Sequence, residues 1–191
     1  MLSMPIRTNT ITVTCMAMIA ALGIAARFLI RIPLVPNLVE LTPGFLFSEL
    51  SGVVGGLAGG MLVGAAIGVG GAIAGGEFPL MPMIGNIFLG VGTGYAIHFT
   101  KDRDSLRYAL MVVLGGGLIG GFVPDMTVFL PLTESFQAAF LAALADTIQG
   151  LFWAPVALFV ERAVIRPLLG HYLYAYPQQL TLERTERDEN V

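Results

Sequence analysis

Apolar residues dominate this chain in runs that are long enough to cross a lipid bilayer. A spanning helix needs about 20 mainly apolar residues, because each residue adds about 1.5 Å across roughly 30 Å of hydrocarbon. Four stretches meet this requirement directly: 9–30, 81–100, 106–123 with a possible extension to Leu130, and 136–160. The pattern therefore predicts an all-α membrane protein.

Small residues recur at every fourth position within these runs. The longest series is Gly52, Gly56, Gly60, Gly64, Gly68, Ala72 and Gly76, and shorter series are Ala17, Ala21 and Ala25, then Gly90 and Gly94, then Ala138, Ala142, Asp146, Gly150 and Ala154. Glycine costs about 0.8 to 1.0 kcal/mol relative to alanine in a helix in water, so a soluble helix would not collect so many. In a bilayer, small residues let helix backbones approach closely. The spacing predicts tightly packed membrane helices.

The segment 45–75 is too long for one upright helix and barely long enough for two. Positive residues favour the cytoplasmic side of a membrane. With Arg7 inside, two short helices in this segment also place inside the basic loop 101–107 and the arginines Arg162 and Arg166. We therefore expect six transmembrane helices with both termini cytoplasmic, the short second and third helices being separated near the glycines 55–60. The alternative is that the segment 45–75 forms one tilted helix, which gives five spans in all.

Composition leaves little material for an extramembrane domain. Of the 191 residues, 55% are hydrophobic and 12% are charged, against about 25% charged in an average soluble domain. We expect one six-helix membrane domain over residues 1–170 and a polar cytoplasmic tail over 171–191. The net charge of -3 comes mostly from this tail, which we interpret as a solvated terminus without an assigned function.

The sequence gives no support for enzymatic or metal chemistry. One cysteine, Cys15, and two histidines, His98 and His171, cannot form a closed zinc site of the usual spacing. The glycine clusters 68–76 and 115–121 lack the GK[ST] ending of a phosphate-binding loop, so we expect no ATP site of that kind. We therefore expect no enzyme, no cofactor and no bound metal.

A few polar side chains interrupt the predicted membrane helices. Such residues usually face a cavity or a partner, because lipid solvates them poorly. Asp146, Gln149 and Trp153 share one helix face by their spacing, and an acid, an amide and an indole together suit a polar heterocyclic ligand. The predicted substrate-binding residues are Asp146, Gln149, Asn86, Glu49, Trp153 and Glu40.

Each of these side chains also has a structural interpretation. Asp146 and Gln149 could simply form hydrogen bonds between helices. Asn86 lies on the same ridge as Gly90 and Gly94 and could join its helix to a neighbour. Glu49 is close enough to the interface to be hydrated, and Trp153 is close enough to the inner leaflet to be an interfacial anchor.

The three loops that the predicted topology places outside are 31–43, 76–82 and 124–135. All are rich in proline, which fixes φ and removes a hydrogen-bond donor, so these loops are expected to be stiff. We expect them to be able to form a lid, with Glu40, Glu77 and Asp125 as candidates for closing a pocket mouth.

Three features occur together between Ile6 and about Arg166: the Ala17, Ala21, Ala25 series, the loop IPLVPNLVELTP at 32–43, and the segment GVVGGLAGG at 52–60. In this combination the chain resembles the substrate-binding S components of energy-coupling factor (ECF) transporters. The resemblance implies that the protein captures a vitamin or trace nutrient from outside, in a pocket lined by the later helices and capped by the first loop. It further implies that the Ala17, Ala21, Ala25 face docks on a transmembrane coupling protein, driven by two ATPase subunits, and that the protein then topples in the membrane.

The expected partners are therefore the coupling protein, the two ATPase subunits, a small-molecule nutrient and the lipid bilayer, with no nucleic acid. The expected location is the plasma membrane. One alternative is a self-sufficient permease or ion-coupled carrier with Glu49 and Asp146 as coupling carboxylates, which predicts inverted repeats. Another is a non-transporting assembly factor without a ligand pocket. The nutrient itself is not predicted.

Overall fold

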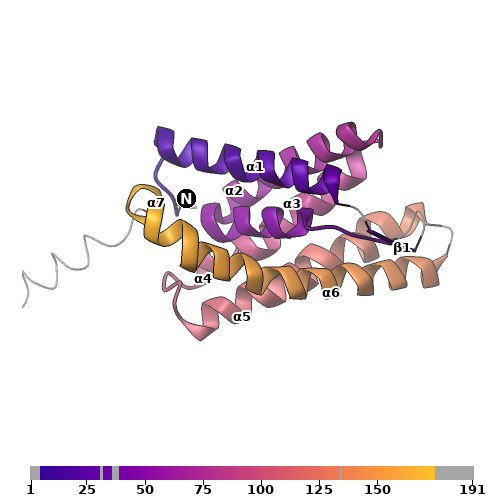
Figure 1. The fold of residues 1–191 in the computed structure, drawn as a ribbon. Coiled ribbons are helices and arrows are strands. Elements are labelled where there is room, and N and C mark those ends of the chain that lie inside the picture. The colour runs from indigo at the N-terminus through magenta and orange to yellow at the C-terminus, as the bar shows by residue number, and fades with distance from the viewer. Residues whose placement is uncertain (1–4, 31, 36–38, 134, 175–191) are drawn as a thin grey trace, which may run out of the picture.

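A computed structural model describes residues 5–30, 32–35, 39–133 and 135–174, and shows long helices lying side by side in a bundle (Figure 1). In chain order, the elements are α1 (Thr10–Leu29), β1 (Ile32–Val35), β2 (Val39–Leu41), α2 (Gly44–Gly75), α3 (Leu80–Gly94), α4 (Ala96–Phe99), α5 (Leu106–Leu114), the π-helical segments η1 (Gly115–Phe122) and η2 (Asp125–Phe129), the 3-10 turn η3 (Leu130–Leu132), α6 (Phe136–Val160), the π-helical η4 (Glu161–Ile165) and α7 (Arg166–Leu173).

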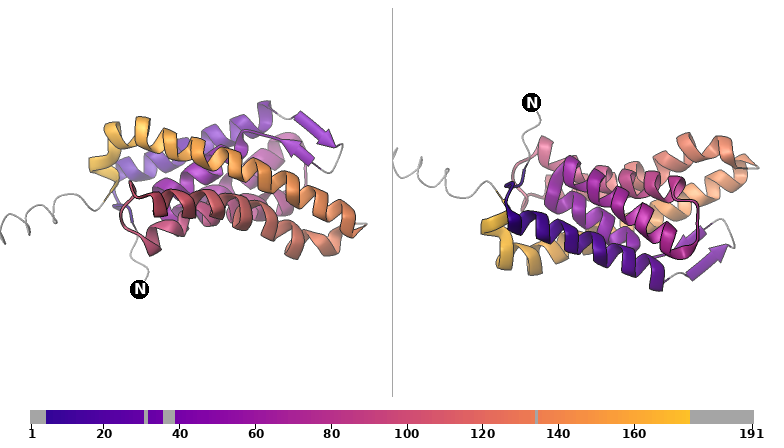
Figure 2. Two further views of the ribbon diagram at one scale, coloured as in Figure 1. Left: turned by 90° about the horizontal axis from the view of Figure 1, so that it is seen from below. Right: turned by 90° about the horizontal axis from the view of Figure 1, so that it is seen from above.

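Five helical segments in the described part of the chain are long and apolar enough to cross a membrane. They are Thr10–Leu29, Gly44–Gly75, Leu80–Phe99, Leu106–Leu132 and Phe136–Leu173. The four spans predicted directly from the sequence coincide with the first, third, fourth and fifth of these segments. The last segment continues beyond the predicted end at residue 160, and α6 and α7 together run along the whole bundle (Figure 2).

The second of these segments, α2, is broken at Gly56. There φ is 65° and ψ is -159°, a conformation that is not helical and that glycine adopts far more readily than other residues. The break lies within the glycine cluster where the sequence predicts it. It divides α2 into a first arm, residues 44–55, and a second arm, residues 57–75.

The two arms of α2 run in opposite directions beside α3. Gly52 in the first arm and Gly60 in the second both lie against Gly90 of α3. In the same way, Ser48 and Gly64 both meet Asn86. Because positions on either side of Gly56 share their neighbours in mirror order, the chain reverses direction at the break.

The contact between the arms and α3 is made by backbone atoms. A Cβ atom added at Gly52, Gly60 or Gly64 would overlap backbone atoms of α3. The four-residue glycine spacing therefore keeps this surface free of side chains, as expected for helices that associate in lipid. By length and composition α2 is one of five candidate membrane spans, Gly44–Gly75. The expectation of six spanning helices therefore stays a prediction.

Two short strands follow α1 and were not predicted from the sequence pattern. β1 and β2 pair in antiparallel fashion, with Ile32 opposite Leu41 and Pro33 opposite Glu40. The expectation of an all-α protein thus holds for the body of the bundle, but it omitted this strand pair. The predicted tail falls almost entirely on residues 175–191, which lie outside the described residues.

At one end of the bundle, here called the arginine end, Arg103, Arg162 and Arg166 lie together. Arg162 donates a hydrogen bond of 2.8 Å to the backbone oxygen of Arg103, and Arg166 forms an ion pair with Asp104. The N-terminal segment lies at this end as well, close to α7 (Figure 1).

The opposite end, here called the loop end, carries β1 and β2 together with parts of the other loops predicted to face outward (Figure 1). Arg27, near the end of α1, pairs with Glu77 from the turn between α2 and α3. The backbone N–H of Thr42, which follows β2, donates to Gln149 of α6. Residues of all three loop regions expected to form a lid, Thr42, Glu77 and Asp125, lie around one cavity at this end.

Candidate substrate-binding cavity

A cavity of about 520 Å³ lies at the loop end, between α1, the first arm of α2, α3, η1, η2 and α6. Its volume falls within the roughly 300–1,000 Å³ typical of small-molecule sites. The polar or charged side chains that line it are Arg27, Thr42, Glu77, Asn86, Asp125 and Asp146. Two of these, Asp146 and Asn86, are substrate-binding residues predicted from the sequence.

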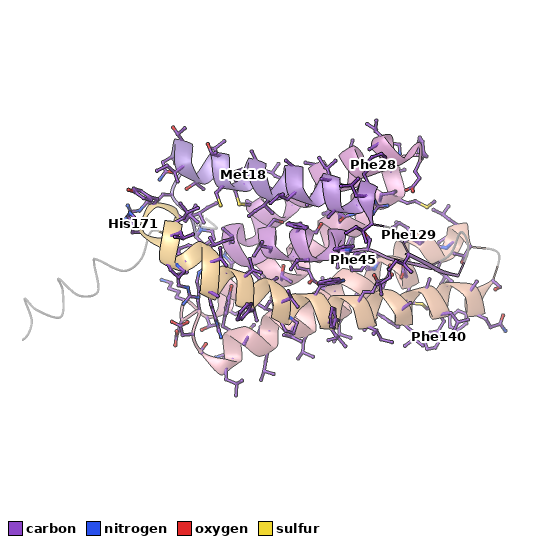
Figure 3. All side chains as sticks on the ribbon, viewed as in Figure 1. Met18, Phe28, Phe45, Phe129, Phe140 and His171 are labelled. Atoms are coloured by element: carbon purple, nitrogen blue, oxygen red, sulfur yellow. The ribbon has the colours of Figure 1, made fainter. Side chains whose placement is uncertain are left out.

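Aromatic rings provide much of the apolar wall of the cavity. Phe45 comes from the first arm of α2, Phe78 from the turn before α3, and Phe129 from η2. Figure 3 shows Phe45 and Phe129 at the loop end of the bundle. Flat apolar surfaces from three separate elements suit a ligand that contains a ring.

Gln149 does not line the cavity, but it positions residues that do. Its amide nitrogen donates a hydrogen bond of 3.1 Å to Oδ1 of Asp146. Its amide oxygen accepts the backbone N–H of Thr42 at 3.2 Å. Gln149 therefore connects α6 to the chain that follows β2, and it orients the Asp146 carboxyl group.

Asn86 is 3% exposed, and its side chain joins two helices at the cavity wall. Its amide nitrogen donates to the backbone oxygen of Pro82 at 2.8 Å, and its amide oxygen accepts the hydroxyl hydrogen of Ser48 at 2.6 Å. The structural role considered for Asn86 is thus present alongside its place in the cavity lining.

Asp125 is a cavity residue that was expected only at the pocket mouth. It is 6% exposed, and within the described part of the chain its Oδ2 atom contacts no hydrogen-bond donor. The sequence predicted an outward loop over 124–135, but the helical path continues through η2 and keeps Asp125 inside the bundle. The apolar stretch as far as Leu130 was the signal in the sequence that could have placed it there.

Arg27 also lines the cavity, and it was not among the predicted site residues. Its guanidinium lies 3.3 Å from a carboxylate oxygen of Glu77, and the Arg27 side chain is only 12% exposed. An arginine at the end of an apolar helix usually extends toward the membrane surface. Its burial depends on a partner 50 residues away, which no local pattern shows.

Glu49 and Trp153 lie outside the cavity lining. Glu49 is fully buried, so its interpretation as a hydrated interfacial residue is wrong; its carboxyl group lies near Gly116 of η1. Trp153 is half-buried and packs edge to face on Phe152, with ring centroids 4.9 Å apart. Glu40 belongs to β2, and its side chain lies outside the described part of the structure.

The predicted docking face of α1 is exposed. Ala17, Ala21 and Ala25 lie on the exposed side of the helix, whereas Cys15 and Ile19 on the other side are buried in the core of the bundle. Its use as an interface with a partner stays a prediction.

No protein-family model and no curated protein matches this sequence. Among solved structures, the fold is similar to that of the S-component for biotin from an ECF-type ABC transporter, with a TM-score of 0.62 and 18% sequence identity. The match covers 82% of this chain and 95% of that chain. The chain therefore has the fold of an S component.

Proposed function

We propose that this protein is the membrane-embedded substrate-binding subunit of an ECF-type importer for a vitamin or related micronutrient. The observation that carries the proposal is the cavity at the loop end, which combines aromatic walls with buried polar side chains. The fold supports the same class of protein, since a solved structure with a similar fold is the S-component for biotin from an ECF-type ABC transporter.

The proposed topology has six crossings of the plasma membrane. Since the two arms of α2 run antiparallel, each is counted as one crossing. The arginine end faces the cytoplasm by the positive-inside rule, which leaves the cavity open to the outside. An importer needs its binding site on that side before transport begins.

In this proposal Asp146 and Asn86 contact the substrate, and Gln149 positions Asp146. Glu40 remains a candidate for covering the bound molecule, because Thr42, two residues later in the chain, lines the cavity. Glu49 and Trp153 lie outside the cavity lining and are left as structural residues of the bundle.

Energy for transport would come from two ATPase subunits through a coupling protein. The exposed Ala17, Ala21 and Ala25 face allows a partner helix to approach closely. Ala21→Trp should therefore abolish copurification of the coupling protein but leave the cavity able to bind its substrate. Loss of substrate binding, or unfolding in detergent, would instead make this face part of the internal packing.

Blocking the cavity tests the function directly. Gly85 lines the cavity, and a Cβ atom there would lie 4.0 Å from its nearest neighbour, Phe129, so a larger side chain has room to enter. The wild-type protein, purified in detergent after incubation with yeast extract, should release a small molecule on heating. Gly85→Trp should release none while keeping its unfolding temperature.

Ala66→Trp is the matched control, because Ala66 is exposed on the second arm of α2 and outside the cavity lining. It should release the same molecule as the wild type. If the wild-type protein releases nothing, or if Gly85→Trp releases as much as the wild type, the cavity is not a substrate site.

A further inference from the structure

The described charged residues that line the cavity are mostly acidic. Glu77, Asp125 and Asp146 carry carboxyl groups, and Arg27 carries the positive charge. Arg27 forms its ion pair with Glu77, from the turn before α3, at 3.3 Å. Asp125 and Asp146 therefore leave negative charge that the described lining residues do not balance.

The two aspartates face the cavity with few donors of their own. Oδ2 of Asp125 contacts no hydrogen-bond donor in the described part of the chain, although the residue is more than nine-tenths buried. Asp146 receives a hydrogen bond at Oδ1 from Gln149, which is uncharged. The two carboxyl groups also repel each other, and Arg27 attracts Asp146 only through space. Such a pair keeps its negative charge only if something else supplies positive charge and donors; without them the carboxyl groups take up protons.

We propose that the substrate is an organic cation, a protonated amine or a positively charged nitrogen heterocycle, that binds between Asp125 and Asp146. The inference rests on the proposed function and narrows its substrate class. Nitrogen donors of a cation would form charge-assisted hydrogen bonds with both carboxylates, which are stronger than neutral ones. The same ligand would replace the missing partner of Asp125.

The walls and the size of the cavity agree with this class. Phe45, Phe78 and Phe129 offer aromatic surfaces, and an aromatic face attracts a cation placed over it. A bare metal ion would leave most of the 520 Å³ empty, whereas an organic molecule with a ring would occupy it.

An anionic substrate is disfavoured by the same charges. The structurally similar S-component is for biotin, which is a carboxylate. A carboxylate in this cavity would meet Asp125 and Asp146 and would depend on Arg27, which already forms an ion pair with Glu77. Like charges placed together in a poorly solvated site repel strongly. The two chains thus share a fold but are expected to differ in the charge of the substrate.

The experiment uses the full chain purified in detergent and yeast extract as the source of ligands. Immobilised wild-type protein is incubated with the extract, washed and heated, and the released compounds are identified by mass spectrometry in both polarities. A compound with a positive charge at pH 7 is expected. A compound that carries no positive charge at pH 7 would overturn the inference even though the proposed function stands, while release of nothing would remove both.

Variants test whether the aspartates hold this compound. Asp125→Asn and Asp146→Asn should each reduce the amount captured by about tenfold or more, the effect of losing a charge-assisted hydrogen bond. Asp102→Asn makes the same chemical change at an exposed position in the loop before α5 and should capture as much as the wild type. Undiminished capture by both cavity variants would overturn the inference. If either variant fails to fold, the charge of the compound captured by the wild type still tests whether the substrate is a cation.

Discussion

The two ends of the bundle use buried acids in opposite ways. At the arginine end, the fully buried carboxyl group of Glu161 accepts two hydrogen bonds from Arg166, at 3.0 and 2.8 Å, and one from the hydroxyl of Tyr174 at 2.8 Å. At the loop end, Asp125 has a carboxyl oxygen without a donor in the described structure. Buried polar groups are normally satisfied by their own protein. Glu161 is therefore satisfied within the fold, whereas the proposal assigns the open position on Asp125 to the substrate.

The arginine end also stabilises the break in α2. A helix end leaves its last carbonyl groups without intrahelical partners, which is costly where water is scarce. Arg103 donates to the backbone oxygens of Val53 and Val54, just before Gly56. Its guanidinium group also lies 4.1 Å from the centre of the Tyr174 ring. One side chain therefore connects the reversal of α2 to the end of α7.

The largest effect should follow the loss of Glu161. Glu161→Ala leaves the guanidinium of Arg166 and the hydroxyl of Tyr174 without their buried partner, and breaking such a pair costs about 3–5 kcal/mol. The free energy of unfolding in detergent should fall by that amount. Asp104→Ala removes the other, largely exposed carboxylate that contacts Arg166 and should change stability by less than about 1 kcal/mol. Equal losses in the two variants would show that Glu161 has no special role in the fold.

A smaller loss is expected at Arg103. Arg103→Ala leaves the carbonyl groups of Val53 and Val54 without this donor, and an unsatisfied buried acceptor costs about 1–3 kcal/mol. Arg107→Ala removes an exposed arginine at the start of α5 and should leave the free energy of unfolding nearly unchanged. If Arg103→Ala is as stable as the wild type, the break at Gly56 is held by packing alone.

Much of the bundle could be predicted because it follows from local spacing. The positive residues of the loops and the glycines 55–60 predicted the break near Gly56, and the four-residue glycine spacing predicted a backbone surface for close packing; both features are present. The apolar runs located the long helices for the same reason, since burial in lipid depends on the composition of each segment alone. The strand pair β1 and β2 has no such signal, because its short length and prolines resemble an ordinary loop.

Local sequence signals located part of the candidate site. Asp146 and Gln149 share a face by their spacing, and the structure joins them by a hydrogen bond. Arg27 and Asp125 were missed as cavity residues, because their positions depend on distant contacts and on an unusual continuation of a helix past Pro124. The burial of Glu49 was also misjudged. Its position along the helix suggested contact with water, but its exposure depends on which neighbouring helices pack against it.

The smallest effect is expected for Gln149, on the affinity for the substrate. This variant tests whether Gln149 positions Asp146 or contacts the substrate itself. Gln149→Ala removes the hydrogen bonds to Asp146 and to the backbone of Thr42, but the cavity carboxylates remain. The affinity for the compound captured from yeast extract should fall by about 1 kcal/mol, close to the value of one or two ordinary hydrogen bonds. Gln137→Ala, at an exposed position on α6, should bind as the wild type does. A loss as large as that of Asp146→Asn would mean that Gln149 contacts the substrate itself, and an unchanged affinity would limit Gln149 to helix packing.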